Sequence, residues 1–420
     1  MDRQPLTERL GDRILLNTYP VAANNLMPVN RPVVYFEDLN GGTFFTFNAG
    51  SGVSDEIECK YGNSLDSLTA TDTDVSGNIP TGRNGGKGWS IVAGYVSGIP
   101  YIYMLREDPS GTGAEILHRW TATSSGLSGL VTETDARLAG NPFMNNLERY
   151  PCSISADISG LLAARRSTAN INQFGSYGTL PTDGRTGEFG LNTTYFPEFM
   201  GMFQLSDGFI GITAENGSSG GATDCFLEEA TKTNIGDAWG TFSNVTPSGF
   251  TARYSANESH WGQVAITQFH SGEILYANVA DGGVSSGGDY GAIQVAIREN
   301  TQAGAWSLVS TDLLNGTDVY GVFAGAVGSG NVILAYIKRS DGSKSNRIHY
   351  RTVSSSGSVS SEKTLAFLPS GSLFTRGSFG HSLNNSWASD ADADSIPFSL
   401  IVETSAGSGI YDRYDGLIKI

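Results

Sequence analysis

One pattern constrains the fold of this chain more than any other. Short apolar strands, separated by turns, recur along the whole sequence with a period of roughly 58 residues. His118 in one copy and His349 in another are each followed eight residues later by a glycine, Gly126 or Gly357. A repeat of this length with several strands per unit is typical of an architecture in which each unit buries its faces against the next one.

We therefore predict an all-β fold, a β-propeller of seven four-stranded antiparallel blades, with six blades and one long insertion as the alternative count. Second strands such as residues 332–337 are continuously apolar, which is expected where neighbouring blades cover both faces. One or two β-sandwich domains are the rival architecture, but regular spacing without a linker favours the propeller. The first strands of the units are expected to begin near Val33, Ile91, Ile154, Met202, Val264, Val322 and Phe379.

The chain divides into two regions on this reading. Residues 31–420 carry the repeat and are predicted to form the propeller, and residues 1–30 are predicted to form an N-terminal arm. The arm is expected to act as a strap, as a contact with a neighbouring molecule, or as a closing strand around residues 13–16. Residues 410–414 and 417–420 are expected to supply the third and fourth strands of the last blade.

Composition limits the class of partner. The net charge is −16 and only 16% of residues are charged. This balance disfavours nucleic acid, because phosphate contacts require clustered Lys and Arg, although it is compatible with a local basic patch on one rim. Charged residues such as Arg3 and Glu8 interrupt any signal-peptide core, and no apolar run has the length of a membrane span. Cys59, Cys152 and Cys225 are scattered and are expected to be buried thiols.

Two turns point to a family. Residues 234–239 and 301–306 each place a glycine before a tryptophan that is expected to open the last strand of a unit. This pattern resembles a degenerate Asp-box, the Ser-X-Asp-X-Gly-X-Thr-Trp turn of sialidase-like propellers, although no copy carries the full motif. In that family the Asp binds the turn backbone and the Trp packs between sheets. The resemblance thus implies a propeller, and it does not by itself imply catalysis.

The catalytic set of the sialidase-like family is only faintly matched. Such enzymes use three arginines for a carboxylate, a Tyr/Glu nucleophile pair and an Asp acid. Arg31 resembles the first arginine, and Arg253 and Arg376 also precede expected first strands. No specific position matches the Tyr/Glu pair or the Asp. We therefore expect no catalytic residues and no hydrolysis of glycosides.

Ligand binding has better candidates. Trp89 and the pair His260 and Trp261 lie at the entry to expected first strands, where loops open on one mouth of the channel. A Trp exposed there suits stacking on a sugar ring, while packing between blades is the alternative role. Together with Arg31 and Arg376, these residues form the candidate ligand-binding set.

A single segment has metal-ligand spacing. Asp390, Asp392 and Asp394 place three carboxylates at alternate positions, and oxygen ligands at this spacing suit Ca²⁺. The following residues lack the glycine turn and distal Glu of an EF-hand loop, so a solvated acidic loop is the alternative reading. No other cofactor is expected.

The chain resembles virion propellers of tailed bacteriophages, and this implies a non-enzymatic role. We expect a tail, fibre or head-surface protein that serves assembly or host attachment. It would be made in the host cytoplasm without a signal peptide. Its expected partners are other virion proteins, copies of itself and a cell-surface glycan, with no nucleic acid and no membrane span. The alternative is a sialidase-like glycoside hydrolase or a glycan-binding lectin.

Overall fold

The computed structural model describes the chain in segments, within which the strands can be traced. The described residues are 17–21, 32–49, 57–71, 89–107, 115–135, 152–154, 161–168, 171–177, 185–192, 196–216, 225–234, 237–250, 264–279, 292–314, 319–328, 330–338, 347–368, 371–383, 395–405, 408 and 410–419.

The described strands pair into seven sheets, here numbered I to VII in chain order. Sheet I contains β2 (Val33–Phe36), β3 (Thr43–Ala49), β4 (Ile57–Gly62), β5 (Thr69–Thr71) and β27 (His381–Leu383), with the 3-10 turn η1 (Leu39–Gly41) between β2 and β3. Sheet II contains β6 (Trp89–Val96), β7 (Ile99–Glu107), β8 (Glu115–Thr123) and β9 (Gly126–Asp135). Sheet III contains β10 (Cys152–Ile154), β11 (Leu161–Thr168), β12 (Ile171–Tyr177) and β13 (Arg185–Asn192).

The remaining sheets follow the same order. Sheet IV contains β14 (Phe196–Leu205), β15 (Gly208–Asn216), β16 (Cys225–Lys232) and β17 (Ser243–Asn244). Sheet V contains β18 (Val264–Gln268), β19 (Ile274–Val279), β20 (Ile293–Arg298) and β21 (Trp306–Ser310). Sheet VI contains β22 (Val319–Val327), β23 (Asn331–Lys338), β24 (Arg347–Ser354) and β25 (Lys363–Phe367). Sheet VII contains β26 (Leu373–Phe379), β28 (Ser395–Glu403), β29 (Tyr411–Lys419) and β1 (Asn17–Val21).

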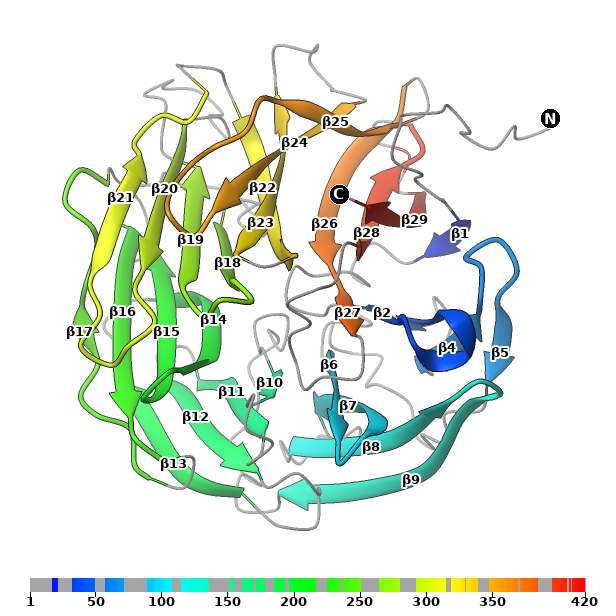
Figure 1. The fold of residues 1–420 in the computed structure, drawn as a ribbon, viewed down its shortest axis with the longest axis horizontal. Helices are drawn as coiled ribbons and strands as arrows, with labels where there is room; N and C mark the ends of the chain where they lie inside the picture. Colours follow the sequence, from blue (N-terminus) through cyan, green and yellow to red (C-terminus); the bar gives the residue numbers. More distant parts are fainter. Residues whose placement is uncertain are drawn as a thin grey trace.

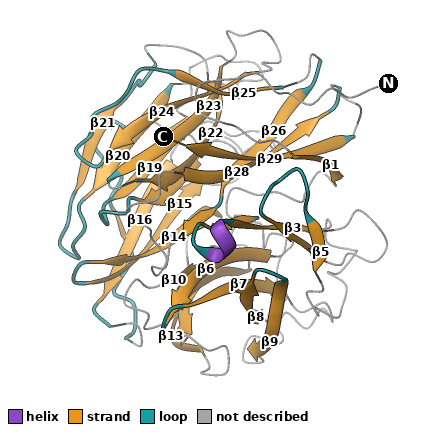
Figure 2. Cartoon of the chain, turned by 45° about the vertical axis from the view of Figure 1, so that its right-hand side comes forward, coloured by secondary structure: helices purple, strands orange, loops and turns teal. Residues whose placement is uncertain are grey.

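The sheets stand around a common axis, with the first strand of each sheet nearest the centre (Figure 1). The inner strands contact one another in sequence order around this ring, and the last sheet contacts the first through β2 and β28. In a view turned by 45°, the described residues are mostly strands, and η1 is a single short turn (Figure 2). The prediction of an all-β propeller built from four-stranded antiparallel sheets is confirmed. Sheet I departs from it by one added strand, β27, which pairs with β2 in parallel.

Burial between neighbouring sheets explains the pattern of apolar residues in the strands. Every position of the second strands β19 and β28 is buried, as their continuous apolar runs predict. The third strand β20 is also buried throughout, although the alternation of its residues predicts one polar face in solvent, because sheets lie on both of its sides. The outer strand β21 is only half-buried, because one of its faces is in solvent. Among the described side chains, apolar clusters join sheet I to II, IV to V, V to VI and VI to VII, so these sheets bury apolar faces against their neighbours.

Close approach near the axis requires glycine at two inner positions. A Cβ on Gly325 of β22 would lie 2.5 Å from Phe379 of β26, and one on Gly377 of β26 would lie 2.8 Å from Phe323 of β22. Each inner strand thus leaves a slot for the phenylalanine of the other, and the two rings lie 5.1 Å apart. The sequence repeat therefore has small residues where the sheets converge.

The register of the repeat is confirmed in three dimensions. His118 on β8 lies opposite Met104, and His349 on β24 lies opposite Tyr336, so both histidines occupy the third strand of their sheets. Gly126 and Gly357 have φ of 116° and 85°, which side chains rarely adopt. The equal spacing from histidine to glycine therefore corresponds to the same turn in both sheets, since each glycine follows the third strand of its sheet.

Sheet VII closes the ring with both ends of the described chain. β1 pairs antiparallel with β29, from Asn17 opposite Asp415 to Val21 opposite Tyr411. A closing N-terminal strand was one of the expected roles of the arm, and β1 at residues 17–21 has this role. Residues 13–16, where the strand was expected, lie outside the described residues. The expectation of two C-terminal strands was wrong: residues 411–419 form the single strand β29, and β1 supplies the fourth strand.

A second set of contacts joins sheet VII to sheet I. β26 ends at Phe379, where the sequence suggested that a first strand begins, and the chain then enters sheet I as β27. Arg413 and Asp415, both 0% exposed, form an ion pair of 2.8 Å in β29. Arg413 also donates to the carbonyl of Phe47 in sheet I. Ser395 of sheet VII donates to Glu37 on the sheet I side, at 2.7 Å. Polar bonds thus tie sheet VII to sheet I across the apolar seam.

A proline scan of β1 tests the closure. Backbone N–H groups of an edge strand point alternately toward and away from the partner strand. Pro20 has no N–H, so we expect it at a position that faces away from β29. The N–H of Tyr19 should then donate to β29, and the N–H of Thr18 should point away from it. Tyr19→Pro should lower the free energy of unfolding by at least about 1 kcal/mol relative to Tyr19→Ala, because one ladder hydrogen bond is lost. Thr18→Pro should differ little from Thr18→Ala. Urea unfolding measures all four variants, and equal losses at the two positions would contradict closure through this ladder.

Candidate functional site

The strand order gives the ring two different rims. Connections between the first and second strands, and between the third and fourth strands, lie at one rim, here called the turn rim. Connections between the second and third strands, and from one sheet to the next, lie at the opposite rim, here called the loop rim.

Hydrogen bonds between turns lock the turn rim from sheet IV to sheet VI. The N–H of Ser206 donates to the Asn300 side chain at 3.1 Å, and Asn300 in turn donates to the Ser271 carbonyl at 3.2 Å. His270 Nδ1 lies 2.9 Å from the Gly328 carbonyl. Burial lowers the pKa of His270, although this carbonyl contact opposes the effect. The turn rim is therefore a fixed surface in these sheets.

The predicted ligand-binding set is only partly visible in this frame. Trp89 is the first residue of β6, and its backbone pairs with that of Arg106. Arg376 lies inside β26, not before it. Arg31, His260 and Trp261 lie outside the described residues, as do Asp390, Asp392 and Asp394. The sugar-binding and calcium sites therefore stay predictions.

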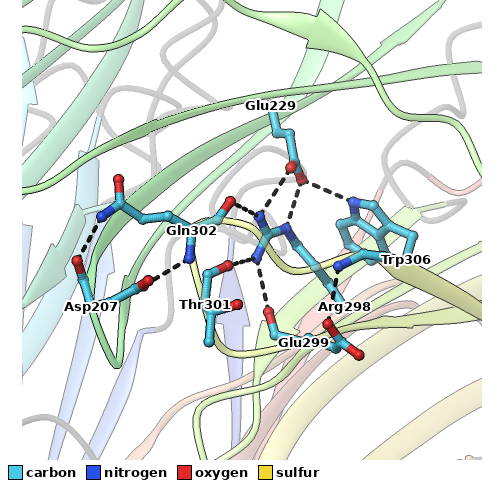
Figure 3. A network of polar contacts seen from close by, with 8 residues as sticks. Asp207, Glu229, Arg298, Glu299, Thr301, Gln302 and Trp306 are labelled. Carbon is cyan, nitrogen blue, oxygen red and sulfur yellow. Dashed lines mark hydrogen bonds and ion pairs between the residues drawn. The ribbon is translucent and has the colours of Figure 1, made fainter.

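An arginine whose guanidinium N–H groups are all hydrogen-bonded joins sheets IV and V near the turn rim (Figure 3). Arg298, at the end of β20, is 0% exposed, and its Nε lies 2.8 Å from the Glu229 carboxylate of β16. One Nη2 hydrogen bond reaches the other Glu229 oxygen at 3.0 Å, and another reaches the Gln302 carbonyl at 3.2 Å. Nη1 donates to the carbonyls of Glu299 and Thr301, at 2.8 and 2.7 Å.

These five bonds use all five N–H groups of the guanidinium. Trp306, the first residue of β21, donates its indole N–H to the same Glu229 carboxylate at 2.9 Å. Asp207, in the turn of sheet IV, accepts the N–H of Gln302 at 2.7 Å. Since no donor of Arg298 remains for a ligand, this buried group acts as a clamp between two sheets.

The two turns that resemble an Asp-box differ in the structure. Trp306 opens β21, as predicted, whereas Trp239 is buried ahead of β17 and does not open that strand. Trp239 packs against Lys232, whose ammonium lies 4.6 Å from the ring centroid. Burial lowers the pKa of Lys232 to about 8, partly offset by the charge of Asp237. Asp237 also accepts the backbone N–H of Asn234 at 2.8 Å, so a carboxylate does hold this turn.

A second polar cluster lies on sheet VI, toward the loop rim. The Glu362 carboxylate accepts a hydrogen bond from Tyr336 at 2.7 Å, is in contact with Lys338, and lies 3.4 Å from His349 Nδ1. Arg351 donates through Nε to the Tyr336 hydroxyl at 3.2 Å. Glu362 is 26% exposed and Lys338 is 16% exposed, so solvent reaches this cluster, unlike the Arg298 clamp.

Electrostatics keep Glu362 ionised and Tyr336 protonated. Burial alone would raise the pKa of Glu362, but hydrogen bonds from Lys338 and Tyr336 and the charge of His349 lower it. Burial and the bond to Glu362 raise the pKa of Tyr336 above its usual value. Tyr336 is completely buried. A Tyr–Glu pair therefore exists that sequence reasoning missed, but its phenol is neither activated nor accessible as a nucleophile.

The missed residues left a signal in the sequence. Tyr336, His349 and Glu362 are far apart in sequence, and only strand register brings them together. Charge density was the available clue, because residues 331–367 contain six Lys and Arg and only two acidic residues. A locally basic segment in an acidic chain is the kind of departure that indicates a site.

Other chemistry is limited in the part of the chain that the structure describes. No group of three or more His, Cys, Asp or Glu residues there could hold a metal ion. No helix in the same residues combines the length and the apolar character needed to cross a membrane. Cys59 is buried as a free thiol, and burial raises its pKa well above the usual value.

Comparison with known proteins supports the fold. No protein-family model matches the sequence, and no curated protein matches it significantly. The solved structure of the polysaccharide lyase Uly1 aligns with a TM-score of 0.53 at 10% identity, over 90% of this chain and 88% of that one. The β-propeller domain of the Trilobed protease from Pyrococcus furiosus aligns with a TM-score of 0.45 at 11% identity, over 93% and 92%.

A neuraminidase-like protein is also among the similar structures. The subtype N11 neuraminidase-like protein of A/flat-faced bat/Peru aligns with a TM-score of 0.42 at 10% identity, over 97% of this chain and 94% of that one. At these identities the comparisons concern the fold alone.

The sheet VI cluster makes stability depend on acid pH. Because the folded-state pKa of Glu362 is lowered, its contribution is present above the usual value of 4.5 and is lost as pH falls through the lowered pKa. Glu362→Gln should therefore be less stable than the natural chain at pH 7, and the gap should shrink below pH 4.5. Urea unfolding across pH measures this. Glu58→Gln, at a half-exposed pair on β4, controls for net charge, and a gap independent of pH would contradict the assignment.

Proposed function

We propose that this chain is a non-enzymatic structural and adhesion component of a tailed-bacteriophage virion, in which each of the seven sheets is one propeller blade. The observation that carries the proposal is the difference between the two rims. In sheets IV to VI the turns between first and second strands are short and are locked by hydrogen bonds, whereas the connections between second and third strands, at the loop rim, are longer. Loops on a rigid scaffold are where proteins most often place binding residues.

The chain ends fit an assembly role. β1 begins at the turn rim, so the chain enters sheet VII from the side opposite the loop connections. An anchor at one rim and a binding surface at the other would suit a subunit held in a particle and facing a host cell. We propose other virion proteins or copies of this chain as the partners of the arm, a cell-surface glycan as the partner of the loop rim, and the virion as its location.

Buried charge supports a scaffold over a catalyst. The five donors of Arg298 all bind protein groups, and Arg413 and Asp415 are sealed between sheets VII and I. These groups fix one sheet against the next and have no surface from which to act on a substrate. Rigid blades suit a protein that must keep its shape while particles assemble.

Particle assembly tests the proposal directly. A tagged chain expressed in cells that produce the particles should co-purify with them, and removal of residues 1–16 should abolish incorporation while leaving the thermal melt unchanged. Removal of residues 1–30 is a poorer test, because it also deletes β1 and opens the ring. Quantitative mass spectrometry of purified particles measures incorporation. Absence of the full chain from particles would overturn the virion role, and normal incorporation of the shortened chain would remove the arm as anchor.

A sialidase-like hydrolase or a lectin is the second candidate, favoured by the Tyr336–Glu362 hydrogen bond. Burial of Tyr336 and its raised pKa make it a poor nucleophile, so we expect no turnover of a fluorogenic sialoside. Turnover that Tyr336→Phe abolishes would establish the pair as catalytic. Turnover that Arg31→Ala or Arg376→Ala abolishes would instead place a family-like site at those arginines. Either result would replace the non-enzymatic proposal.

A further inference from the structure

One arginine of sheet II is held in place by the fold without an acceptor for its N–H groups. Arg119 of β8 is half-buried, and its Nε is buried with no hydrogen-bond partner. The guanidinium stacks on the ring of Tyr101, with Cζ 4.4 Å from the ring centroid. Within the described part of the chain it makes no hydrogen bond and no ion pair, in contrast to Arg298, whose five donors all bind protein atoms. The charge of Arg119 is therefore positioned but not neutralised.

The strand pairing places two hydroxyl groups beside this guanidinium. Thr121 lies directly opposite Tyr101, and Arg119 is two residues before Thr121 on the same strand. All three side chains project from one face of sheet II, because residues paired across strands share a face and residues two apart share it as well. Trp120 projects from the other face, into the cluster shared with sheet I. Tyr101 and Thr121 are half-buried, and neither hydroxyl is hydrogen-bonded among the residues described.

An irregularity of the outer strand lies directly beside the arginine. Arg119 pairs with Val131, and Thr121 pairs with Ser128. The strand β9 therefore contains one extra residue between these two pairs. Gly129, in this bulge, has a φ of 61°, in the left-handed region. A β-bulge changes the direction in which neighbouring side chains point, and bulges are frequent next to active sites.

The unused groups of Arg119 are those that a carboxylate requires. A guanidinium presents paired N–H groups in one plane, and a carboxylate accepts two of them in parallel. Stacking on Tyr101 and burial of Nε keep water from part of the guanidinium, which strengthens its attraction to an anion. The two Nη atoms are not buried, so a ligand can reach them from solvent. One uncompensated cation balances a single negative charge, which favours a carboxylate over a doubly charged phosphate.

We infer that Arg119, Tyr101 and Thr121 form a binding site for an acidic sugar residue, whose carboxylate binds the Nη groups of Arg119. The hydroxyls of Tyr101 and Thr121 bind hydroxyl groups of the same sugar ring, because each can both donate and accept a hydrogen bond. Tyr101 lies near the start of β7 and Thr121 near the end of β8, on the side of the turn rim. The site is thus separate from the glycan surface proposed for the loop rim and does not depend on it.

Titration with single sugars tests the site. The full chain should bind glucuronate and should not bind glucose, which has the same ring without the carboxylate. Arg119→Gln should weaken glucuronate binding at least about tenfold, because a pair of charge-assisted hydrogen bonds is lost. Lys60→Gln removes the same charge from β4 in sheet I and should leave the affinity unchanged. Ligand-observed NMR measures the dissociation constants, and thermal melts verify folding.

Two conservative variants separate recognition from folding. Arg119→Lys keeps the charge but loses the planar pair of N–H groups, so it should lose most of the affinity for glucuronate. Tyr101→Phe keeps the ring under the guanidinium and removes only the hydroxyl, so it should weaken binding about threefold. A purely structural Arg119 would instead change the thermal melt of these variants and leave the affinity of the folded protein as it was.

Each outcome decides the inference. Loss of glucuronate binding in Arg119→Gln, with binding retained in Lys60→Gln, would support it. Absence of binding to both glucuronate and N-acetylneuraminate, an equal loss in the two variants, or equal binding of glucose would overturn it. Tighter binding of a short glutamate-rich peptide would also contradict it and would assign Arg119 to an acidic protein partner. Particle incorporation is measured separately, so a failure here leaves the virion proposal to its own test.

Discussion

Closure of the ring is the constraint on which the rest of this structure depends. Each sheet is apolar on the faces that meet its neighbours, so an open ring would leave two such faces in water. The pairing of β1 with β29 and the passage of β27 into sheet I hold the last sheet against the first. Arg413, which pairs with Asp415 within β29, also donates to the Phe47 carbonyl of sheet I and so favours one alignment, since a mismatched seam would lose this buried hydrogen bond.

Charged residues play two different parts once the ring is closed. Around Arg298 the charged groups bind only other protein groups, because Glu229 and backbone carbonyls accept hydrogen bonds from every guanidinium N–H. These bonds fix sheet IV against sheet V. Around Glu362 they remain partly exposed, and Lys338 and His349 both contact the same carboxylate. The same residue types are thus fully buried at one place and partly open to solvent at another.

The two rims of the ring differ in structure. Locked turns make one rim a stable base, which β1 joins from the N-terminal side. The ends of β23 and β24 place basic side chains at the opposite rim. A subunit that is anchored at one rim and binds its partner at the other would combine both properties in one ring.

The sequence by itself determined the repeat, and with it the all-β ring, since apolar runs flanked by glycine turns have few other ways to bury both faces. It also located the turns at Gly126 and Gly357 and the strand start at Trp306, because these depend on local backbone and packing preferences. Only the tertiary structure decided that residues 17–21 complete sheet VII, since pairing across almost the whole chain leaves no local trace. The contacts among Tyr336, His349 and Glu362 could not be predicted from the sequence either, because the pairing register of the strands brings these residues together. A shift of one residue in that register would turn the side chains of a strand to the other face of the sheet.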